Sequence, residues 1–197
     1  MAGVIPGFFC LILKKLSQIP LPDVLIMRIM DNKPLFEAHY QLHFEAIFRF
    51  CFRFLNSRES ALDITQETFM KLFERMNQQG KEIENTKAWL YKVAGNLCLN
   101  MLNSKGKHSE IESILPSNPV ETTTPESILI HNENADLVRN ILGQLKPESR
   151  LLILMYQDGL SYREMSEATG ISINSVGKTL WRIIEKISET IKTKNHE

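Results

Sequence analysis

The sequence has no excess of charge of either sign, because 23 Lys and Arg residues balance 23 Asp and Glu residues. This balance argues against a polybasic coat for nucleic acid, although a neutral total can conceal a basic face opposite an acidic segment. Glycine is also scarce, with 9 in 197 residues. Leu, Ile, Glu, Lys and Met are plentiful instead. Such a composition disfavours a turn-rich β fold and predicts an all-α protein.

Cysteine is scarce too, and its spacing excludes the common cysteine motifs. Cys10, Cys51 and Cys98 are an odd number and share no Cys-x-x-Cys spacing. Two of them fall in apolar helical stripes, so we expect reduced thiols in a core rather than disulfides or metal ligands. A cytoplasmic location fits this cysteine usage.

The N-terminal segment VIPGFFCLILKKL is too short to span a membrane, and its charged and apolar residues do not follow the order of an export signal. Its apolar run is far shorter than the ~20 residues that span a bilayer, and Pro6 interrupts it. Its charges, Lys14 and Lys15, follow the apolar run, whereas a secretory signal places them first. We expect no membrane insertion.

Residues 1–33 are predicted to be an N-terminal extension, because regular helical patterning begins only after Pro34. We hypothesise that translation starts at Met27 or Met30, so that residues 1–26 lie upstream of the true start. Mass spectrometry of the natively expressed protein tests this start, and an intact Met1 terminus would contradict it.

Apolar residues spaced three and four apart predict three amphipathic helices between residues 34 and 108. The first stripe is Phe36, Tyr40, Phe44, Ile47, Phe48, Cys51 and Leu55; the second is Leu62, Thr65, Phe69, Leu72, Phe73 and Met76; the third is Trp89, Leu90, Val93, Ala94, Leu97, Cys98, Met101 and Leu102. The segment NSRES separates the first two helices, and Asn85 or Thr86 is expected to cap the third. The three helices can bury their faces against one another as one domain.

Residues 109–126 are predicted to be a flexible linker, because three prolines appear there and all charged residues are acidic. Helical patterning resumes in residues 127–197, which form the second predicted domain. Pro147 suits the first turn of a helix over Glu148 to Asp158, and Gly159 can take the left-handed conformation that ends it.

The sequence MSEATGISINSVGKTLW predicts a helix-turn-helix. Ser161 and Glu164 form a capping box for a short helix that Gly170 ends, and Ser172 can cap the last helix. In a DNA-binding version, the residues assigned to DNA are Ser172, Ile173, Asn174, Ser175, Lys178, Thr179 and Arg182. Crossed helices also occur in domains that never touch nucleic acid, and this basic face is thin. We therefore expect the helix to bind DNA weakly by itself.

His39 and His43 stand one helical turn apart, a spacing that zinc enzymes use. However, Tyr40 follows His39 where those enzymes carry a glutamate, and no third ligand is evident. The sequence therefore predicts no metal site, no cofactor and no catalytic site.

Three separated segments carry a family resemblance. In chain order they are ALDITQETFMKLFERM, NTKAWLYKVAGNLCLNML and LGQLKPESRLLILMYQDGLSYREMSEATGISINSVGKTLWRIIEKI. Together they resemble regions two and four of extracytoplasmic-function (ECF) sigma factors of the sigma-70 family, from about Phe36 to Ile187. The resemblance implies that residues 34–108 are region two and residues 127–197 are region four. It also implies a sigma factor that directs RNA polymerase to promoters.

The resemblance assigns residues to three surfaces. The segment D-x-x-Q-E-x-F-x-x-L, which docks on the polymerase core, corresponds to Asp63, Gln66, Glu67, Phe69 and Leu72. The residues assigned to the melted minus-10 element are Trp89, Tyr91, Lys92, Asn96, Asn100, Asn103, Lys105 and Lys107. The helix-turn-helix would read the minus-35 element through the major groove. The implied partners are the RNA polymerase core and promoter DNA, with an anti-sigma factor as a third candidate.

Two aromatic residues of the minus-10 segment differ in their expected surroundings. Trp89 lies on the apolar stripe and is predicted to be a core residue. Tyr91 lies off the stripe and is predicted to stack on an exposed base. The chain departs from many relatives at Asn100 and Asn103, where those carry Asp or Arg.

The residues by themselves are also compatible with other functional classes of protein. The runner-up is a helix-turn-helix regulator that binds an operator without acting as a sigma subunit. The third is an all-α interaction protein or a metal-dependent helical enzyme that uses His39 and His43. Two weak DNA-binding modules fixed on one polymerase gain affinity through effective concentration, so neither needs a strongly basic surface. Co-purification with the polymerase core would separate these classes.

Overall fold

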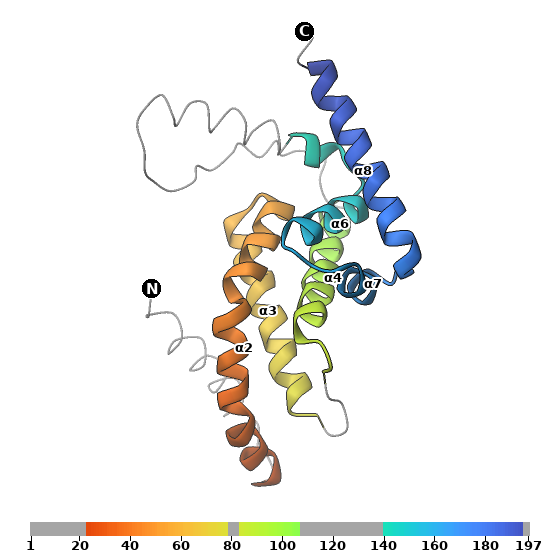
Figure 1. The fold of residues 1–197 in the computed structure, drawn as a ribbon. Coiled ribbons are helices and arrows are strands. Elements are labelled where there is room, and N and C mark those ends of the chain that lie inside the picture. The colour runs from red at the N-terminus through yellow and green to blue at the C-terminus, as the bar shows by residue number, and fades with distance from the viewer. Residues whose placement is uncertain (1–22, 79–82, 107–139, 195–197) are drawn as a thin grey trace, which may run out of the picture.

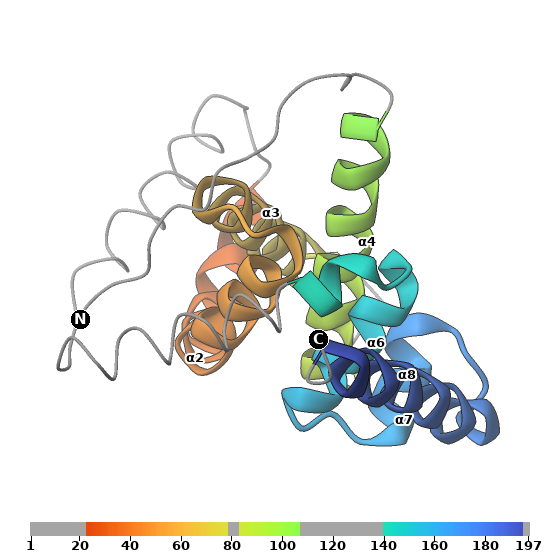
Figure 2. The same ribbon diagram turned by 90° about the horizontal axis from the view of Figure 1, so that it is seen from above.

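The computed structural model describes residues 23–78, 83–106 and 140–194, and this part of the chain forms helices and turns without a strand. The all-α prediction is confirmed. The helices are α2 (Asp23–Leu55), α3 (Arg58–Met76), α4 (Thr86–Gly106), α6 (Pro147–Gln157), α7 (Tyr162–Thr169) and α8 (Ile173–Lys194). Figures 1 and 2 show α4 between the pair α2 and α3 on one side and the group α6, α7 and α8 on the other.

Helix α2 begins earlier than the sequence pattern predicted. It starts at Asp23 and continues through Pro34, so the expectation that helical structure begins only after Pro34 is wrong. Proline removes one backbone hydrogen bond and crowds the preceding turn, which normally costs about 3 kcal/mol in a helix interior. A tertiary contact supports this part of the helix: the Asn32 side-chain amide donates to the Met76 carbonyl at 3.0 Å and to Asn77 Oδ1 at 3.2 Å.

The turn between α2 and α3 follows the predicted break. Asn56 has a φ of 53°, a left-handed conformation that asparagine tolerates better than most residues. Ser57 then caps α3, because its hydroxyl oxygen accepts from the Ser60 N–H at 3.3 Å. At the start of α4, Asn85 Oδ1 accepts from the Ala88 N–H at 3.0 Å, so Asn85 is the cap that was predicted.

Helices α2, α3 and α4 pack most of the predicted stripes against one another, but Leu62 of the second stripe is exposed. Tyr40 and Phe69 meet edge to face at 4.9 Å between ring centroids, and Phe36 meets Phe73 at 5.2 Å. Cys51 and Cys98 are buried together, as expected of core thiols. Contact between the two thiols, followed by burial, raises the pKa of Cys98. Cys10 lies outside the described residues.

The C-terminal unit shows the predicted end signals. Pro147 occupies the first turn of α6, and Gly159 follows it with a φ of 72°. Ser161 and Glu164 form both hydrogen bonds of the capping box of α7, and Gly170 ends that helix with a φ of 76°. Residues 140–144 form a short helical segment before α6. The prediction of a helix-turn-helix made of α7 and α8 is confirmed.

The two units share one continuous apolar core rather than two separate ones. Gly95 on α4 provides the close approach: a Cβ at this position would lie 3.4 Å from Leu151 and 3.6 Å from Met155, both on α6. The sequence pattern gave no signal of this contact between the units. The predicted acidic linker, residues 109–126, lies outside the described residues.

Candidate polymerase and nucleic-acid interfaces

Helix α3 separates the predicted polymerase-binding residues into two groups. Asp63 and Glu67 are exposed and Gln66 is half-buried, so these side chains form an accessible polar face. Glu67 lies 3.4 Å from Lys71 one turn later. The two carboxylates of this face are accessible to a partner.

Phe69 and Leu72 belong to the other group, and their assignment to the polymerase surface is corrected. Both side chains are completely buried in the core of the N-terminal unit. The Phe69 ring packs against Tyr40 and Phe44, so it cannot contact a partner while the unit is folded. These two residues instead hold α3 so that Asp63 and Glu67 face outward.

Helix α4 places most of the predicted minus-10 residues on one exposed face. Lys92, Asn96, Asn100 and Asn103 are exposed, and their spacing of four, four and three residues puts them on the same side of the helix. Trp89 is half-buried against the core, so it is less enclosed than predicted. The Lys105 side chain and Lys107 lie outside the described part of the chain.

Tyr91 differs from the prediction most clearly. It is only 2% exposed, and its ring meets Phe50 edge to face at 5.0 Å. Its hydroxyl donates to Asp158 Oδ2 at 3.0 Å, across the contact between the two units. Burial and the neighbouring Asp158 raise the pKa of Tyr91. The expectation of an exposed, base-stacking Tyr91 is therefore wrong for this arrangement of the units.

The first two turns of α8 present the predicted minus-35 residues. Ser172, Ile173, Asn174, Ser175, Lys178 and Arg182 are all exposed. Thr179 is half-buried, and its hydroxyl donates to the Ser175 carbonyl of the same helix at 2.8 Å, so this residue is a poorer candidate for a base contact than predicted. Val176, Leu180 and Ile183 face the core on the opposite side.

Trp181 is a candidate that the sequence reasoning missed. It is 63% exposed and lies on the same side of α8 as Asn174 and Lys178. The helical spacing from Asn174 could have identified it, because positions 174, 178 and 181 share one face. Ile184 is also exposed, at 42%, next to the buried Ile183.

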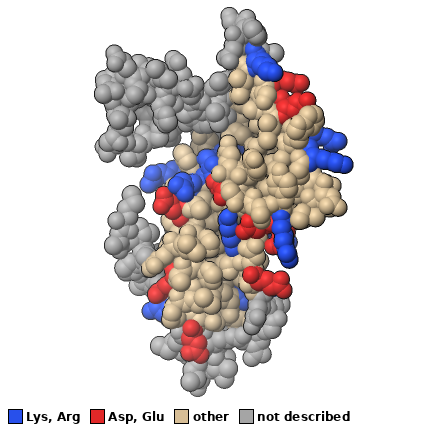
Figure 3. Space-filling view, in the orientation of Figure 1, with Lys and Arg blue, Asp and Glu red and all other residues tan. Residues whose placement is uncertain are grey.

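The charges near these faces are mixed. On the face drawn in Figure 3, positive and negative side chains are interspersed among uncharged residues. Arg163 on α7 is neutralised locally by Glu167 at 3.2 Å. Lys178 and Arg182 are thus the main cations of the exposed start of α8, which agrees with the thin basic face inferred from the sequence.

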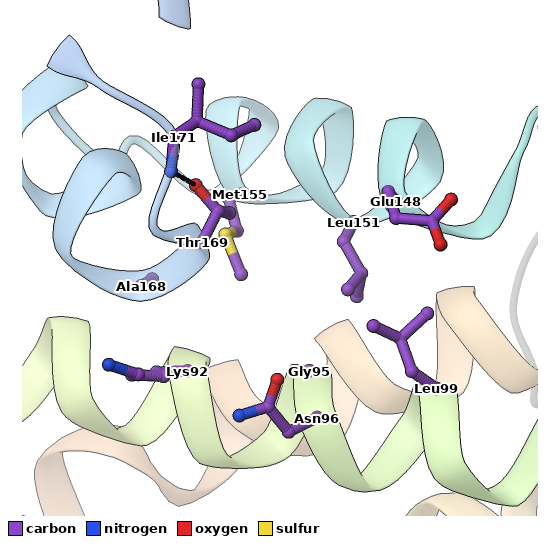
Figure 4. A pocket seen from close by; sticks show the side chains of 10 residues that line it. All are labelled: Lys92, Gly95, Asn96, Leu99, Glu148, Leu151, Met155, Ala168, Thr169 and Ile171. Atoms are coloured by element: carbon purple, nitrogen blue, oxygen red, sulfur yellow. Dashed lines mark hydrogen bonds between the residues drawn. The ribbon is translucent and has the colours of Figure 1, made fainter.

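A cavity of about 150 Å³ lies between α4 and the helices of the C-terminal unit. Figure 4 shows Leu99 from α4 and Leu151 from α6 pointing into it, with Lys92 toward one end and Glu148 toward the other. Asn96 also lines the cavity. Part of the predicted minus-10 face therefore borders the C-terminal unit in this arrangement.

His39 and His43 show no metal-binding geometry. Their rings stack at 6.1 Å between centroids, and burial lowers the pKa of both side chains. Within the described ranges, no group of three His, Cys, Asp or Glu residues comes together as a metal site. The same part of the chain contains no helix long and apolar enough to cross a membrane.

A substitution tests the unusual glycine on α8. A Cβ at Gly177 would lie 3.3 Å from Tyr162 Cε2, and the half-exposed Tyr162 ring is free to shift. Because glycine costs about 1 kcal/mol of helix propensity relative to alanine, we expect Gly177→Ala to raise the melting temperature by about 2–4 °C. Gly170→Ala is the matched control, and its positive φ predicts destabilisation instead. A fall in melting temperature for Gly177→Ala would contradict the expectation.

The geometry defines a helical protein with a polar face on its N-terminal unit and a helix-turn-helix in its C-terminal unit. Comparison with known families agrees with this class. Residues 39–108 match sigma-70 region 2, and residues 135–187 match sigma-70 region 4. With both regions in the expected order, the chain belongs to the sigma-70 family, in its ECF group.

Individual relatives support the assignment. The ECF RNA polymerase sigma factor SigE of Mycolicibacterium smegmatis is 27% identical over 154 residues, which cover 76% of this chain and 58% of SigE. RNA polymerase sigma factor YlaC of Bacillus subtilis is 27% identical over 171 residues, which cover 85% of this chain and 98% of YlaC. The chain thus spans nearly all of one relative and little more than half of the other.

Two solved structures share the fold. CnrH, solved in complex with the cytosolic domain of CnrY, superposes with a TM-score of 0.63 at 18% identity and covers 86% of this chain and 95% of CnrH. The sigma factor RpoE of Bartonella quintana, solved with the anti-sigma factor NepR, gives a TM-score of 0.61 at 20% identity. The match covers 80% of this chain and 96% of RpoE. At these identities the likeness concerns the fold.

Proposed function

We propose that this protein is an RNA polymerase sigma factor that directs promoter-specific initiation of transcription. The observation that carries the proposal is the presence of region two and region four, in that order, on one chain. Region two binds the polymerase core through α3 and melts the minus-10 element with α4. Region four reads the minus-35 element with the start of α8.

The physical properties of the faces support this division of labour. The exposed start of α8 carries only Lys178 and Arg182 as its main cations, which is few for an independent DNA-binding protein. Attachment to polymerase supplies the missing affinity, because a second contact made from the same complex benefits from a high effective concentration. The chain itself contributes binding and positioning, and we propose no enzymatic activity for it.

The proposed partners are the polymerase core, promoter DNA and an anti-sigma factor. The third partner is proposed because RpoE of Bartonella quintana was solved with an anti-sigma factor. We place the protein in the cytoplasm, where a sigma subunit meets the polymerase. We also propose that region two spans residues 34–108, that region four spans residues 127–197, and that residues 109–126 form the linker that joins them.

Reconstitution with the polymerase core tests the function directly. We expect the full chain to co-purify with the core and to give run-off transcripts with defined start sites. A chain that binds operator DNA tightly alone, and does not bind polymerase, would favour the helix-turn-helix regulator instead.

The polar face of α3 gives a more specific prediction. Asp63→Lys combined with Glu67→Lys replaces two negative side chains by positive ones at the proposed polymerase contact. We expect the double variant to bind the core about tenfold more weakly or worse, because the new charges no longer complement the partner surface. Both side chains are exposed, so the melting temperature should change little. Binding can be measured by competition with a labelled sigma factor.

Glu45→Lys on α2 is a control for that double variant, with half of its change in net charge. Glu45 is exposed and pairs only one turn along its own helix, with Arg49 at 3.5 Å. It should bind the core normally. Equal losses in the double variant and in Glu45→Lys would mean that overall charge, rather than the α3 face, sets the affinity.

A further inference from the structure

Exposed apolar side chains gather along one side of α8. Ile173, Trp181 and Ile184 are 49%, 63% and 42% exposed, and helical spacing places all three on the same side of the helix. The exposed Tyr162 ring of α7 lies against Gly177, with Cε2 3.3 Å from the position of an added Cβ. Gly177 lies one turn from both Ile173 and Trp181, so the ring makes the apolar surface continuous. We call Tyr162, Ile173, Trp181 and Ile184 the α8 apolar patch.

The α8 apolar patch lies outside the core of the C-terminal unit. Val176, Leu180 and Ile183 hold α8 on its own unit from the adjoining side of the helix, where all three are buried. Figure 1 shows the second half of α8 continuing past α6. Neighbouring exposed aromatic and aliphatic side chains mark a surface that binds a partner. Because this patch follows the axis of one helix, the partner that fits it is another helix.

The charges beside the patch indicate which helix. Lys178 and Glu185 are seven residues apart, so they lie on the same edge of the patch, with the positive charge first. Both side chains are exposed, and neither has an ion-pair partner among the described residues. When two α8 helices pair antiparallel about a two-fold axis, Lys178 of one copy lies opposite Glu185 of the other, and this pair forms twice. The edge is therefore complementary to a second copy of itself.

The uncharged residues fit the same register. Pairing Lys178 with Glu185 of the second copy brings Trp181 next to Ile184 of that copy. One turn further along, the small Gly177 and Ser188 lie opposite each other. Alternation of large and small side chains lets two helices interdigitate closely. Helix α8 has 22 residues and is ~33 Å long, which is enough for about five turns of overlap.

We propose that the free chain forms a symmetric homodimer through antiparallel pairing of α8, with the α8 apolar patch at its centre and Lys178–Glu185 pairs fixing the register. The dimer itself does not depend on the proposed sigma function. Its consequence does, because Lys178 also belongs to the proposed minus-35 surface. A second copy and minus-35 DNA then compete for the same side of α8.

Sedimentation equilibrium of the full chain tests the dimer, with a thiol reductant present so that no disulfide contributes. We expect a micromolar dissociation constant, so that the unchanged chain is mostly dimer at about 100 μM. Lys178→Glu and Glu185→Lys each convert two attractive pairs into two repulsive ones, and each should raise this constant about tenfold or more. Trp181→Ala removes the largest side chain of the patch from both copies and should raise it about 100-fold.

Mixing the two charge variants tests the antiparallel register. In a dimer of one Lys178→Glu chain and one Glu185→Lys chain, each substituted side chain lies opposite a charge of the other sign. An equimolar mixture should therefore recover most of the lost affinity. Lys71→Glu on α3 and Glu45→Lys on α2 are the matched controls, because they change the same charges at exposed positions of the other unit. Separately or mixed, they should dimerise like the unchanged chain.

The outcomes decide between occupants of the patch. Weakening in the single variants and recovery in the mixture support the dimer. A monomeric unchanged chain at about 100 μM, a mixture without recovery, or equal weakening in the controls overturns it. A monomeric chain in which Trp181→Ala weakens promoter binding would assign the patch to DNA instead. Circular dichroism confirms folding, and the exposed charge variants keep the test valid if Trp181→Ala unfolds. Failure of run-off transcription would count against the sigma function and leave the dimer intact.

Discussion

Phe69→Ala is expected to destabilise region two by about 3–5 kcal/mol, a large share of the roughly 5–15 kcal/mol that holds a typical domain folded. The Phe69 side chain is completely buried and packs against Tyr40 and Phe44, so its removal leaves a cavity in the core. Unfolding in urea, followed by circular dichroism, measures the loss. Polymerase binding should fail together with folding.

Glu67→Ala is the informative comparison, because Glu67 belongs to the same sequence motif but is exposed. Its ion pair with Lys71 is a surface pair one turn apart, worth no more than about 0.5 kcal/mol. Glu67→Ala should leave the unfolding midpoint almost unchanged while it weakens binding to polymerase. A stable Phe69→Ala variant that loses polymerase binding would show that Phe69 does contact the partner.

Lys178→Ala combined with Arg182→Ala should reduce minus-35-dependent transcription by about 100-fold or more. Both side chains are exposed on the outward part of α8, and each contact of this kind to DNA is worth about 1–3 kcal/mol. Loss of phosphate contacts should also lower the slope of log affinity against log salt by about 1 for each residue. Run-off transcription measures the first effect, and holoenzyme binding to promoter DNA at several salt concentrations measures the second.

Lys192→Ala is the control for the charge removed from α8. Lys192 is exposed on the same helix, but it lies near the C-terminal end, far from the helix-turn-helix. It should have little effect on promoter binding. On a promoter with a scrambled minus-35 element, the double variant and the unchanged protein should transcribe alike, and a further loss there would contradict the assignment of α8 to minus-35.

The contact between the two units affects the residues assigned to DNA on α4. Tyr91 packs against Phe50 of its own unit, and its hydroxyl donates to Asp158 of the other unit. In this structure Tyr91 is therefore not accessible for stacking on a base.

Local signals in the sequence were sufficient for the helices and their ends. Ser57, Asn85 and the Ser161–Glu164 capping box act through hydrogen bonds within a few residues, so their effect does not depend on the rest of the fold. Pro34 is the exception, because contacts from Asn32 to the end of α3 lie far away in the chain. No local rule includes such a contact.

The sequence by itself determined the all-α class, the helix-turn-helix and the sigma-factor motifs, because apolar periodicity, capping and motif spacing are properties of short segments. Only the tertiary structure decided which motif residues are accessible. Phe69 and Leu72 share a motif with Glu67 yet lie inside, and Tyr91 packs against Phe50 and donates to a residue 67 positions away. Accessibility depends on packing between distant segments, and a periodic pattern does not specify which helices of two units meet.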